Sequence, residues 1–250
     1  MPLYQATPEI LTDRVILITG AADGIGRAMA LSFAQHGATT ILLDKHVANL
    51  ESLYDQIEDS GYPKAAIYPL DLEKATPDDY ETMASSIEKE FGRLDGIVHN
   101  AAVMGPITPM HLYSIKDWYT VMQINLHAPF LLNQSCLSLL NESADARLLF
   151  VSDACGRQGS AYWGAYGVSK SGLEDMMQIL ADELEANTNI KVNSIDPGVI
   201  RTKMRAFAYP AENPETLPQA ESIMPAFLYL MGPDSKQYNG QAFQADDFCG

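Results

Sequence analysis

The sequence predicts an α/β fold: a doubly wound, parallel, seven-stranded sheet flanked by helices on both faces. Short apolar runs alternate with longer amphipathic segments, which is typical of repeated βαβ units whose helices cover both sides of a sheet. No internal repeat, low-complexity tract or Gly/Ser linker divides the 250 residues. We therefore expect residues 1–250 to form a single domain.

The predicted elements follow this alternation in order. The first strand is Val15–Ile18, the helix after it is Ile25–His36, and Gly37 ends that helix. Thr40–Leu43 is the second strand. Further strands are expected near Ala66–Tyr68, Gly96–His99, Leu148–Val151, Lys191–Ile195 and Gln241–Gln244. The other predicted helices are Pro77–Phe91, Ser114–Leu140 and Ser169–Glu185.

The segment Met204–Ser222 breaks the alternation. It contains three prolines and has little apolar periodicity. A loop of this length in a compact domain is usually functional or mobile. Because it follows the sixth predicted strand, we interpret residues 203–222 as a lid over a substrate site; the alternative is an inert surface loop.

Composition and charge exclude several classes of partner. The net charge of −16, from 16 basic and 32 acidic residues, opposes binding to nucleic acid and anionic membranes. No stretch reaches the ~18 apolar residues of a membrane span, and the start, Met1–Gln5, lacks the pattern of a secretory signal. Cys136, Cys155 and Cys249 are widely spaced, which fits a reducing compartment. We expect a cytoplasmic protein without a metal site, in which the five histidines are structural.

A glycine-rich turn joins the first strand to the first helix. Gly20, Gly24 and Gly26 stand in the run Gly-Ala-Ala-Asp-Gly-Ile-Gly. Glycines here let the backbone turn tightly and approach a pyrophosphate, whose charge meets the helix N-terminus. The placement between a strand and a helix predicts a dinucleotide site in a Rossmann fold.

Asp44, at the end of the second strand, bears on which dinucleotide is bound. A carboxylate there accepts hydrogen bonds from the adenosine ribose diol and repels a 2′-phosphate. Asp23, in the glycine turn, adds to this repulsion, whereas Lys45 could pair with a 2′-phosphate. We expect NAD to be preferred over NADP.

Tyr166 and Lys170 stand four residues apart in Tyr-Gly-Val-Ser-Lys. On a helix, residues at this spacing share one face, so the Lys170 ammonium can favour the ionised form of the Tyr166 phenol. A phenol with a pKa of about 10 is a poor base at neutral pH, and a nearby cation lowers that pKa. With the glycine turn, the pair predicts a nicotinamide-dependent oxidoreductase.

These motifs resemble those of the short-chain dehydrogenase/reductase family, in its single-domain branch, over essentially the whole chain. Thr19-Gly20-x-x-x-Gly24-x-Gly26 matches the family's cofactor motif, and Tyr166 and Lys170 match its catalytic pair. The resemblance implies interconversion of a secondary alcohol and a carbonyl, with a small-molecule alcohol or carbonyl as substrate. It also implies pairing of the helices at Ser114–Leu140 and Ser169–Glu185 across a twofold axis, and hence a homodimer or homotetramer. Met176, Met177, Ile179 and Leu180 offer apolar surface for that contact.

The resemblance also implies roles for further residues. Asn125 matches the asparagine that supports a water relay to the lysine, and Asp71-Leu72 resembles the pair that contacts the adenine. Pro197–Thr202 resembles the segment that cradles the nicotinamide carboxamide. In His99-Asn100-Ala101-Ala102 the two central residues match the family and the outer two depart from it. The implied cofactor-binding residues are Gly20, Asp23, Gly24, Ile25, Gly26, Asp44, Asp71, Leu72, Asn100, Ala101, Tyr166, Lys170, Pro197, Gly198, Ile200 and Thr202.

Within the family, three short motifs resemble the bacterial YciK-type oxidoreductases. They are Gly156-Arg157-Gln158-Gly159, Trp163-Gly164-Ala165-Tyr166 and Met204-Arg205-Ala206. We expect Trp163 to pack near the mouth of the site and Cys155 to serve packing.

The chain departs from the family at the catalytic serine, which normally stands thirteen residues before the tyrosine and three before a glycine. Asp153 occupies this position relative to Tyr166 and Gly156. Ser152 is adjacent, but neighbouring residues at a strand end tend to point apart, so we do not expect it to take over the role.

An ionised Asp153 cannot donate a hydrogen bond to a substrate. At about 4 Å and an effective dielectric of ~20, two like charges repel by roughly 4 kcal/mol, which would raise the pKa of Tyr166 by on the order of three units. Two outcomes remain open. A protonated Asp153 would supply the missing donor, whereas an ionised one would pair with Lys170 or with a cationic substrate.

Two functions of different classes follow. The first is an enzyme in which Tyr166 is the general acid/base, Lys170 lowers its pKa and holds the nicotinamide ribose, Asn125 carries the relay and Asp153 positions the substrate less effectively than a serine. The second is a cofactor-binding protein with little or no turnover, a redox sensor or scaffold, which Asp153 favours. The intact Tyr166, Lys170 and Asn125 favour the enzyme. An epimerase or dehydratase of the longer related branch fits less well, because the chain is short for it.

Overall fold

The structure, a computed structural model, describes residues 4–248, so Cys249 and the first three residues lie outside the described part. Seven strands form one sheet in the order β3-β2-β1-β4-β5-β6-β7, and every neighbouring pair is parallel. This confirms the predicted doubly wound sheet. The strands are β1 (Val15–Thr19), β2 (Thr39–Asp44), β3 (Ala66–Pro69), β4 (Gly96–His99), β5 (Arg147–Val151), β6 (Lys191–Asp196) and β7 (Ala242–Gln244).

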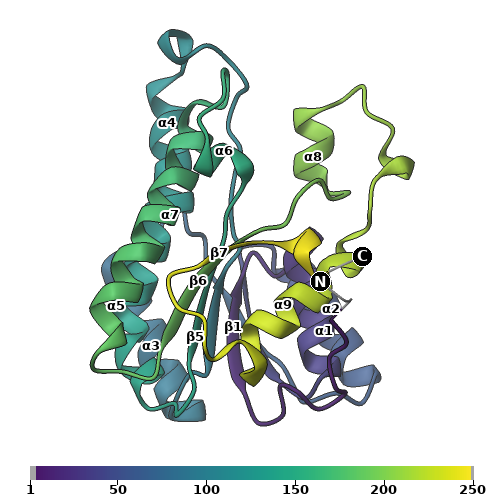
Figure 1. The fold of residues 1–250 in the computed structure, drawn as a ribbon, viewed down its shortest axis with the longest axis vertical. Coiled ribbons are helices and arrows are strands. Elements are labelled where there is room, and N and C mark those ends of the chain that lie inside the picture. The colour runs from purple at the N-terminus through teal and green to yellow at the C-terminus, as the bar shows by residue number, and fades with distance from the viewer. Residues whose placement is uncertain (1–3, 249–250) are drawn as a thin grey trace.

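Helices cover both faces of the sheet (Figure 1), because successive strand residues point to opposite sides. Ile16 and Ile18 of β1 join one buried apolar cluster, together with Phe33 and Phe227 from the helices. Leu17 joins the cluster on the other face. The first face is covered by α1 (Gly24–Gln35), α2 (Val47–Asp59) and α9 (Met224–Met231), and the second by α3 (Pro77–Phe91), α5 (Ala128–Asn141) and α7 (Gly164–Glu185).

Helix α3 has the bounds that the sequence predicts, because its ends carry strong local signals. Thr76 and Asp79 form a reciprocal capping box, and Pro77 occupies the first helical position, where its missing N–H costs nothing. Gly92 ends the helix with a left-handed φ of 73°.

Other helices differ from the prediction. Helices α2, α6 (Ala154–Arg157) and α9 were not predicted, and neither was α8 (Lys203–Ala208), which lies in the segment predicted as a loop. Helix α7 begins at Gly164 instead of Ser169, so Tyr166 lies within it. The predicted helix Ser114–Leu140 consists of α4 (Ile115–Met122), a π-helical turn (Gln123–His127) and α5. Pro129 has no N–H to donate to the carbonyl of Asn125 four residues earlier, which accounts for the irregular turn.

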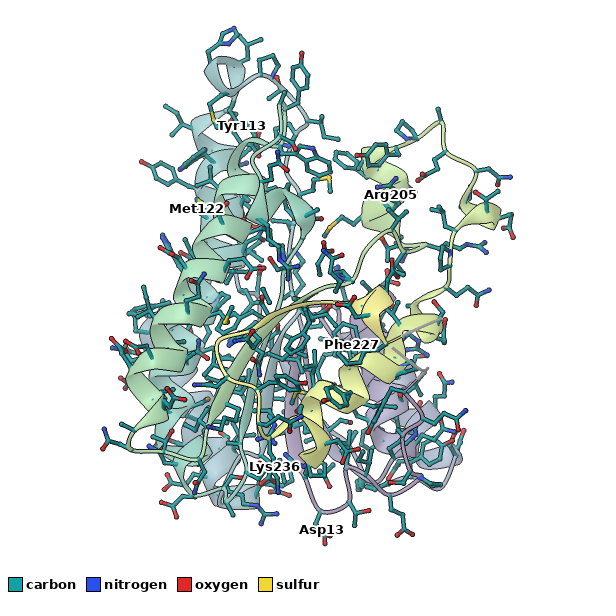
Figure 2. All side chains as sticks on the ribbon, viewed as in Figure 1. Asp13, Tyr113, Met122, Arg205, Phe227 and Lys236 are labelled. Atoms are coloured by element: carbon teal, nitrogen blue, oxygen red, sulfur yellow. The ribbon has the colours of Figure 1, made fainter. Side chains whose placement is uncertain are left out.

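The strand order places a ligand crevice at one end of the sheet. β1 and β4 are neighbours although β2 and β3 come between them in the chain, so the loops that leave these two strands diverge at their carboxyl ends. Figure 2 shows Tyr113 and Arg205 at this end of the molecule and Asp13 and Lys236 at the other. Helix α8 (Lys203–Ala208) stands above the sheet, across from α4 and α6 (Figure 1), and forms the start of the predicted lid.

Short 3₁₀ turns complete the chain at Met110–Leu112, Pro214–Thr216, Ala220–Ile223, Pro233–Ser235 and Ala245–Asp247. No helix within residues 4–248 is both long and apolar enough to cross a membrane.

Candidate active site

A cavity of about 340 Å³ lies where β1, β4, β5 and β6 end, and its volume is in the range of small-molecule sites. Four residues that the sequence assigned to the site do not border it: Gly26, Asp71, Leu72 and Asn125. The others do: Gly20, Asp23, Gly24, Ile25, Asp44, Asn100, Ala101, Asp153, Tyr166, Lys170, Pro197, Gly198, Ile200 and Thr202.

The glycine turn is held closely against the loop after β4. The Asn100 side-chain amide donates to the carbonyl oxygens of Thr19 and Gly20, at 2.9 and 3.2 Å. A Cβ atom on Gly20 would lie 2.9 Å from the Cα of Ala101, and one on Gly26 would overlap the carbonyl oxygen of Gly20. Gly26 therefore does not border the cavity; its lack of a side chain lets the first turn of α1 pack against the backbone of Gly20.

The first turn of α1 presents its N-terminus to the cavity. Asp23 is the N-cap, and its carboxylate accepts a hydrogen bond of 2.8 Å from the amide of Gly24. The same carboxylate forms an ion pair with Lys203, the first residue of α8, and this contact lowers the pKa of Asp23. The glycine turn and the lid helix are thus joined by a salt bridge.

Asp44 is the last residue of β2 and lies at the opposite end of the cavity from Tyr166. Its carboxylate accepts hydrogen bonds from the amides of Ala22 and His46, at 3.3 and 3.0 Å, which fixes it beside the glycine turn. Lys45 does not border the cavity.

Asp71 and Leu72 are placed less favourably for the role that the family resemblance implies. Asp71 forms a 2.9 Å ion pair with Lys74, and Leu72 is buried in the apolar cluster on the α3 side of the sheet. Both residues follow β3, next to Asp44 on β2, so they lie near the expected adenosine end without bordering the cavity.

The residues along this cavity fit a dinucleotide. A carboxylate suited to a ribose diol stands at one end, a turn without side chains and a helix N-terminus suit a pyrophosphate in the middle, and the Tyr166–Lys170 pair stands at the other end. A Cβ atom on Gly20 or Gly26 would collide with neighbouring backbone atoms, so the turn requires glycine at both positions.

Tyr166 and Asp153 are in direct contact. The Tyr166 hydroxyl donates to Oδ2 of Asp153 at 3.2 Å, and Oδ1 of Asp153 accepts from the amide of Cys155 at 2.8 Å, as the N-cap of α6. The Lys170 ammonium donates to the carbonyl oxygen of Val151 at 2.6 Å and lies 5.6 Å from the centre of the Tyr166 ring. Asp153 therefore has the place expected for the catalytic serine.

Burial shifts the titration of both groups of the pair. It raises the pKa of Tyr166 well above its usual range, and the nearby Asp153 carboxylate raises it further. Burial lowers the pKa of Lys170 to about 8, although Asp153 and Asp196 oppose this fall.

Asp196, at the end of β6, is a second carboxyl group near the pair and was not predicted. It is buried, its Oδ1 accepts from the amide of Gly198 at 2.9 Å, and burial raises its pKa. The sequence did contain a signal for this site residue, because Asp196 stands directly before Pro197-Gly198 at a strand end. Ser152 also borders the cavity, and its hydroxyl is buried without a hydrogen-bond partner.

Asn125 supports the site from outside the cavity. Its side chain is fully buried, exchanges two hydrogen bonds of 2.9 Å with the backbone of Val103, and donates to the Ser169 hydroxyl at 3.0 Å. The Asn125 side chain thus ties the loop after β4 to α7. Its backbone carbonyl lacks the α-helical donor because Pro129 follows four residues later.

The segment after β6 and helix α8 border the cavity on the other side. Gly198 has a left-handed φ of 72°, and Thr202 caps α8 by accepting from the amide of Arg205 at 3.1 Å. Within the lid, Arg205 pairs with both carboxylate oxygens of Glu212, at 2.7 and 2.9 Å, and lies 3.7 Å from the centre of the Tyr209 ring.

Apolar and aromatic side chains border the cavity next to Tyr166. The ring of Trp163 lies 5.7 Å from that of Tyr166 and 6.3 Å from that of Tyr209, and it borders the cavity between them. Met104 and Met204 add apolar surface. Cys155 is buried, and burial raises the pKa of its thiol, which fits a packing role.

His99, which departs from the family pattern, is a buried structural residue. Its Nε2 donates to Asn133 at 2.7 Å, its ring stacks on Phe150 at 4.6 Å, and burial lowers its pKa to about 4. Among the residues that the structure describes, no group of three or more His, Cys, Asp or Glu is placed to hold a metal ion.

Comparison with known proteins agrees with this geometry. The sequence model described as short chain dehydrogenase matches residues 14–213. The chain is 43% identical over 242 residues to the uncharacterized oxidoreductase YciK of Escherichia coli K12. The aligned region covers 97% of this chain and 95% of that protein.

Two solved structures have nearly the same fold. A short chain dehydrogenase from Salmonella enterica serovar Typhi CT18 has a TM-score of 0.95 and 44% identity, over 97% of this chain and 99% of that one. A Shigella flexneri 2a chain described as a short chain dehydrogenase, complexed with NADP, has a TM-score of 0.93 and 42% identity, over 96% of this chain and 100% of that one.

Proposed function

This chain belongs to the short-chain dehydrogenase family, and from that premise we propose that it is a nicotinamide-dependent oxidoreductase that interconverts a secondary alcohol and a carbonyl. The observation that carries the proposal is one cavity that holds the glycine turn, Asp44, Tyr166 and Lys170 together. The fit of the turn to a pyrophosphate, and of the Tyr166–Lys170 pair to a reacting oxygen, supports both halves of the reaction.

In this proposal Tyr166 exchanges a proton with the substrate oxygen. The Lys170 ammonium stabilises the phenolate form that results, because the two groups share one face of α7. Asn125 acts by position, since its hydrogen bonds to Val103 and Ser169 hold the loop after β4 against α7. A bound nicotinamide supplies or accepts the hydride.

Asp153 makes the site a weaker carbonyl reductase than a serine would. In the structure it accepts the hydrogen bond of the Tyr166 hydroxyl, so the proton that a carbonyl oxygen needs is directed at a carboxylate. Removing one preorganised donor typically costs ~10²–10³ in rate.

NAD is the cofactor that the geometry of this chain favours. Asp44 borders the cavity and is held in place by two backbone amides, whereas Lys45 does not border the cavity. A 2′-phosphate would therefore meet a fixed carboxylate first. The NADP complex of the Shigella flexneri relative points the other way, so the relative affinity for the two cofactors is the quantity to measure.

The second candidate function is a cofactor-binding protein with little or no turnover. The Tyr166–Asp153 hydrogen bond favours it, because it occupies the catalytic hydroxyl. Two measurements separate the candidates: calorimetric titration with NADH and NADPH, and turnover on a panel of ketones and alcohols with Tyr166→Phe as control. Cofactor binding with turnover that Tyr166→Phe abolishes supports the enzyme; binding without turnover supports the second candidate.

The proposal extends to a lid and to an oligomer. Residues 203–222 act as a lid, since α8 borders the cavity and Lys203 reaches the glycine turn. Of the four residues expected at a subunit contact, Met177 is buried in the core, Met176 and Leu180 pack against the core and only Ile179 is exposed. Phe130 of α5 and Val168 of α7 are exposed as well, and they support a dimer or tetramer formed through these two helices.

A further inference from the structure

Charge is distributed unevenly at the Tyr166 end of the cavity. Two other cations border the cavity, and each has its own carboxylate: Lys203 pairs with Asp23 and Arg205 with Glu212. Arg157, which does not border the cavity, pairs with Glu174. Of the cations that border the cavity in the described part of the chain, Lys170 is the one that forms no ion pair. Among residues 4–248 no ion pair forms at Asp153 or Asp196; both carboxyl groups favour the charged form of Lys170, and Arg157 favours the charged form of Asp196.

Lys170 does not neutralise Asp153 directly. Its ammonium donates to the carbonyl of Val151, while Asp153 receives its hydrogen bonds from the Cys155 amide and the Tyr166 hydroxyl, both of which are uncharged. The groups that face Tyr166 from the neighbouring elements are Asp153, Cys155 and Asp196. The carboxylate of Asp153 therefore faces the Tyr166 hydroxyl without a cation paired to it.

This arrangement suits a nitrogen centre better than an oxygen centre. A ketone oxygen only accepts hydrogen bonds and is repelled by a carboxylate, whereas the N–H of a protonated imine donates to one. Trp163 and Tyr209 border the same space and offer aromatic surface to the body of such a ligand.

We propose that this site also reduces carbon–nitrogen double bonds, and that it prefers a protonated cyclic imine with an aromatic or apolar body to the corresponding ketone. The inference rests on the proposed function, because the reduced nicotinamide is the two-electron donor. The imine carbon gains a hydride, the π pair moves to nitrogen as a lone pair, and the product is an amine. The nitrogen arrives with its proton, so no proton leaves Tyr166, whose raised pKa makes it a poor acid.

The first test compares two bicyclic substrates of similar shape, 3,4-dihydroisoquinoline and 2-tetralone, with the wild-type protein and reduced cofactor. We expect kcat/KM for the imine to exceed that for the ketone by about tenfold or more, the size of one hydrogen bond to a charged group. Asp153→Ser should reverse this ratio. Asp55→Asn removes the same charge from the exposed face of α2 and should leave the ratio unchanged.

The second test measures binding without turnover. Calorimetry with oxidised cofactor present compares 1,2,3,4-tetrahydroisoquinoline, as its ammonium, with isochroman, its uncharged oxygen isostere. We expect the ammonium to bind the wild type about tenfold more tightly, and Asp153→Asn to remove this preference. The wild-type comparison needs no variant, so it holds even if the Asp153 variants fold poorly.

The outcomes separate this inference from the proposed function. Equal or tighter binding of isochroman, or faster turnover of the ketone, overturns the imine preference and leaves a nicotinamide-dependent enzyme in place. Failure to bind either NADH or NADPH overturns the proposed function itself. A protein that turns over neither probe is judged on the binding comparison alone.

Discussion

The hydroxyl of Tyr166 donates to the carboxylate of Asp153 across 3.2 Å, where the family has a serine hydroxyl in place of the carboxylate. The contact joins the end of β5 to the first turns of α7 and replaces a donor with an acceptor at the reacting end of the cavity. The same substitution also raises the pKa of the tyrosine beyond the effect of burial.

Replacing Asp153 by serine should therefore improve carbonyl chemistry. We expect Asp153→Ser to raise kcat on generic ketones or diketones by about tenfold or more, since a missing preorganised donor costs ~10²–10³ in rate. Steady-state kinetics with the preferred cofactor measures this. Tyr166→Phe should abolish the activity in either background, and a fall in ketone activity on Asp153→Ser would show that Asp153 is itself needed for that reaction.

The pH dependence should report the state of Lys170. Because burial lowers its pKa to about 8, the ammonium is present below this pH and is lost as the pH rises through it, so kcat/KM for ketone reduction should decline above about pH 8. The Asp153 carboxylate favours the ammonium, so Asp153→Ser should move the decline to lower pH. Asp55→Asn should leave the profile in place; a profile that stays flat to pH 10 in the wild type argues against this assignment.

Cofactor choice should follow Asp44. We expect the wild type to bind NAD(H) more tightly than NADP(H) in calorimetric titrations, and Asp44→Ser to raise the affinity for NADP(H) about tenfold by removing a fixed negative charge. Lys45→Ala is the matched control: because Lys45 does not border the cavity, its removal should change NADP(H) affinity much less than Asp44→Ser does. Tighter binding of NADP(H) by the wild type would make Lys45 the dominant residue instead.

Stability should depend on Gly26, although it does not border the cavity. A Cβ there overlaps the Gly20 carbonyl oxygen, so Gly26→Ala should cost about 1–3 kcal/mol of unfolding free energy, lower Tm by several degrees and weaken cofactor binding. Thermal unfolding with and without NADH measures both effects. Gly159→Ala is the control, because a Cβ there meets nothing within 4 Å; equal Tm values for the two variants would contradict the steric account.

Self-association should depend on the exposed apolar side chains of α5 and α7. Light scattering at micromolar concentration should give a dimer or tetramer, and Phe130→Glu together with Ile179→Glu should shift it toward the monomer, because both side chains are 53% exposed in one chain. Val47→Glu, at an exposed position on α2, should not change the mass. A monomeric wild type would count against the contact.

Much of the fold is predictable because local signals and the strand pattern agree. All seven strands were expected near their observed positions, and the caps of α3 fix both of its ends. The short helix α6 was missed because four residues carry no periodicity, and the π-helical turn was missed because its cause is Pro129 acting on a carbonyl four residues earlier.

The site residues that belong to recognisable sequence motifs were predictable from the sequence. The cavity gathers most of the expected residues, yet Asp196 and Lys203 were missed, because each matters through a partner that is distant in the chain. Leu72 illustrates the opposite case: the motif places it at the adenosine end, and the core of the protein buries it. The spacing of residues in the sequence identifies the residue types of a site. Which of their side chains form ion pairs depends on how the strands and loops meet in the fold.

The ion pair between Asp23 and Lys203 has a kinetic consequence. It spans the glycine turn and the first residue of the lid helix, and both side chains are exposed, so salt screens it. In the proposed lid, the pair holds residues 203–222 against the glycine turn, where the pyrophosphate is expected to bind. Because salt weakens the pair, the residence time of a bound dinucleotide should shorten as ionic strength rises.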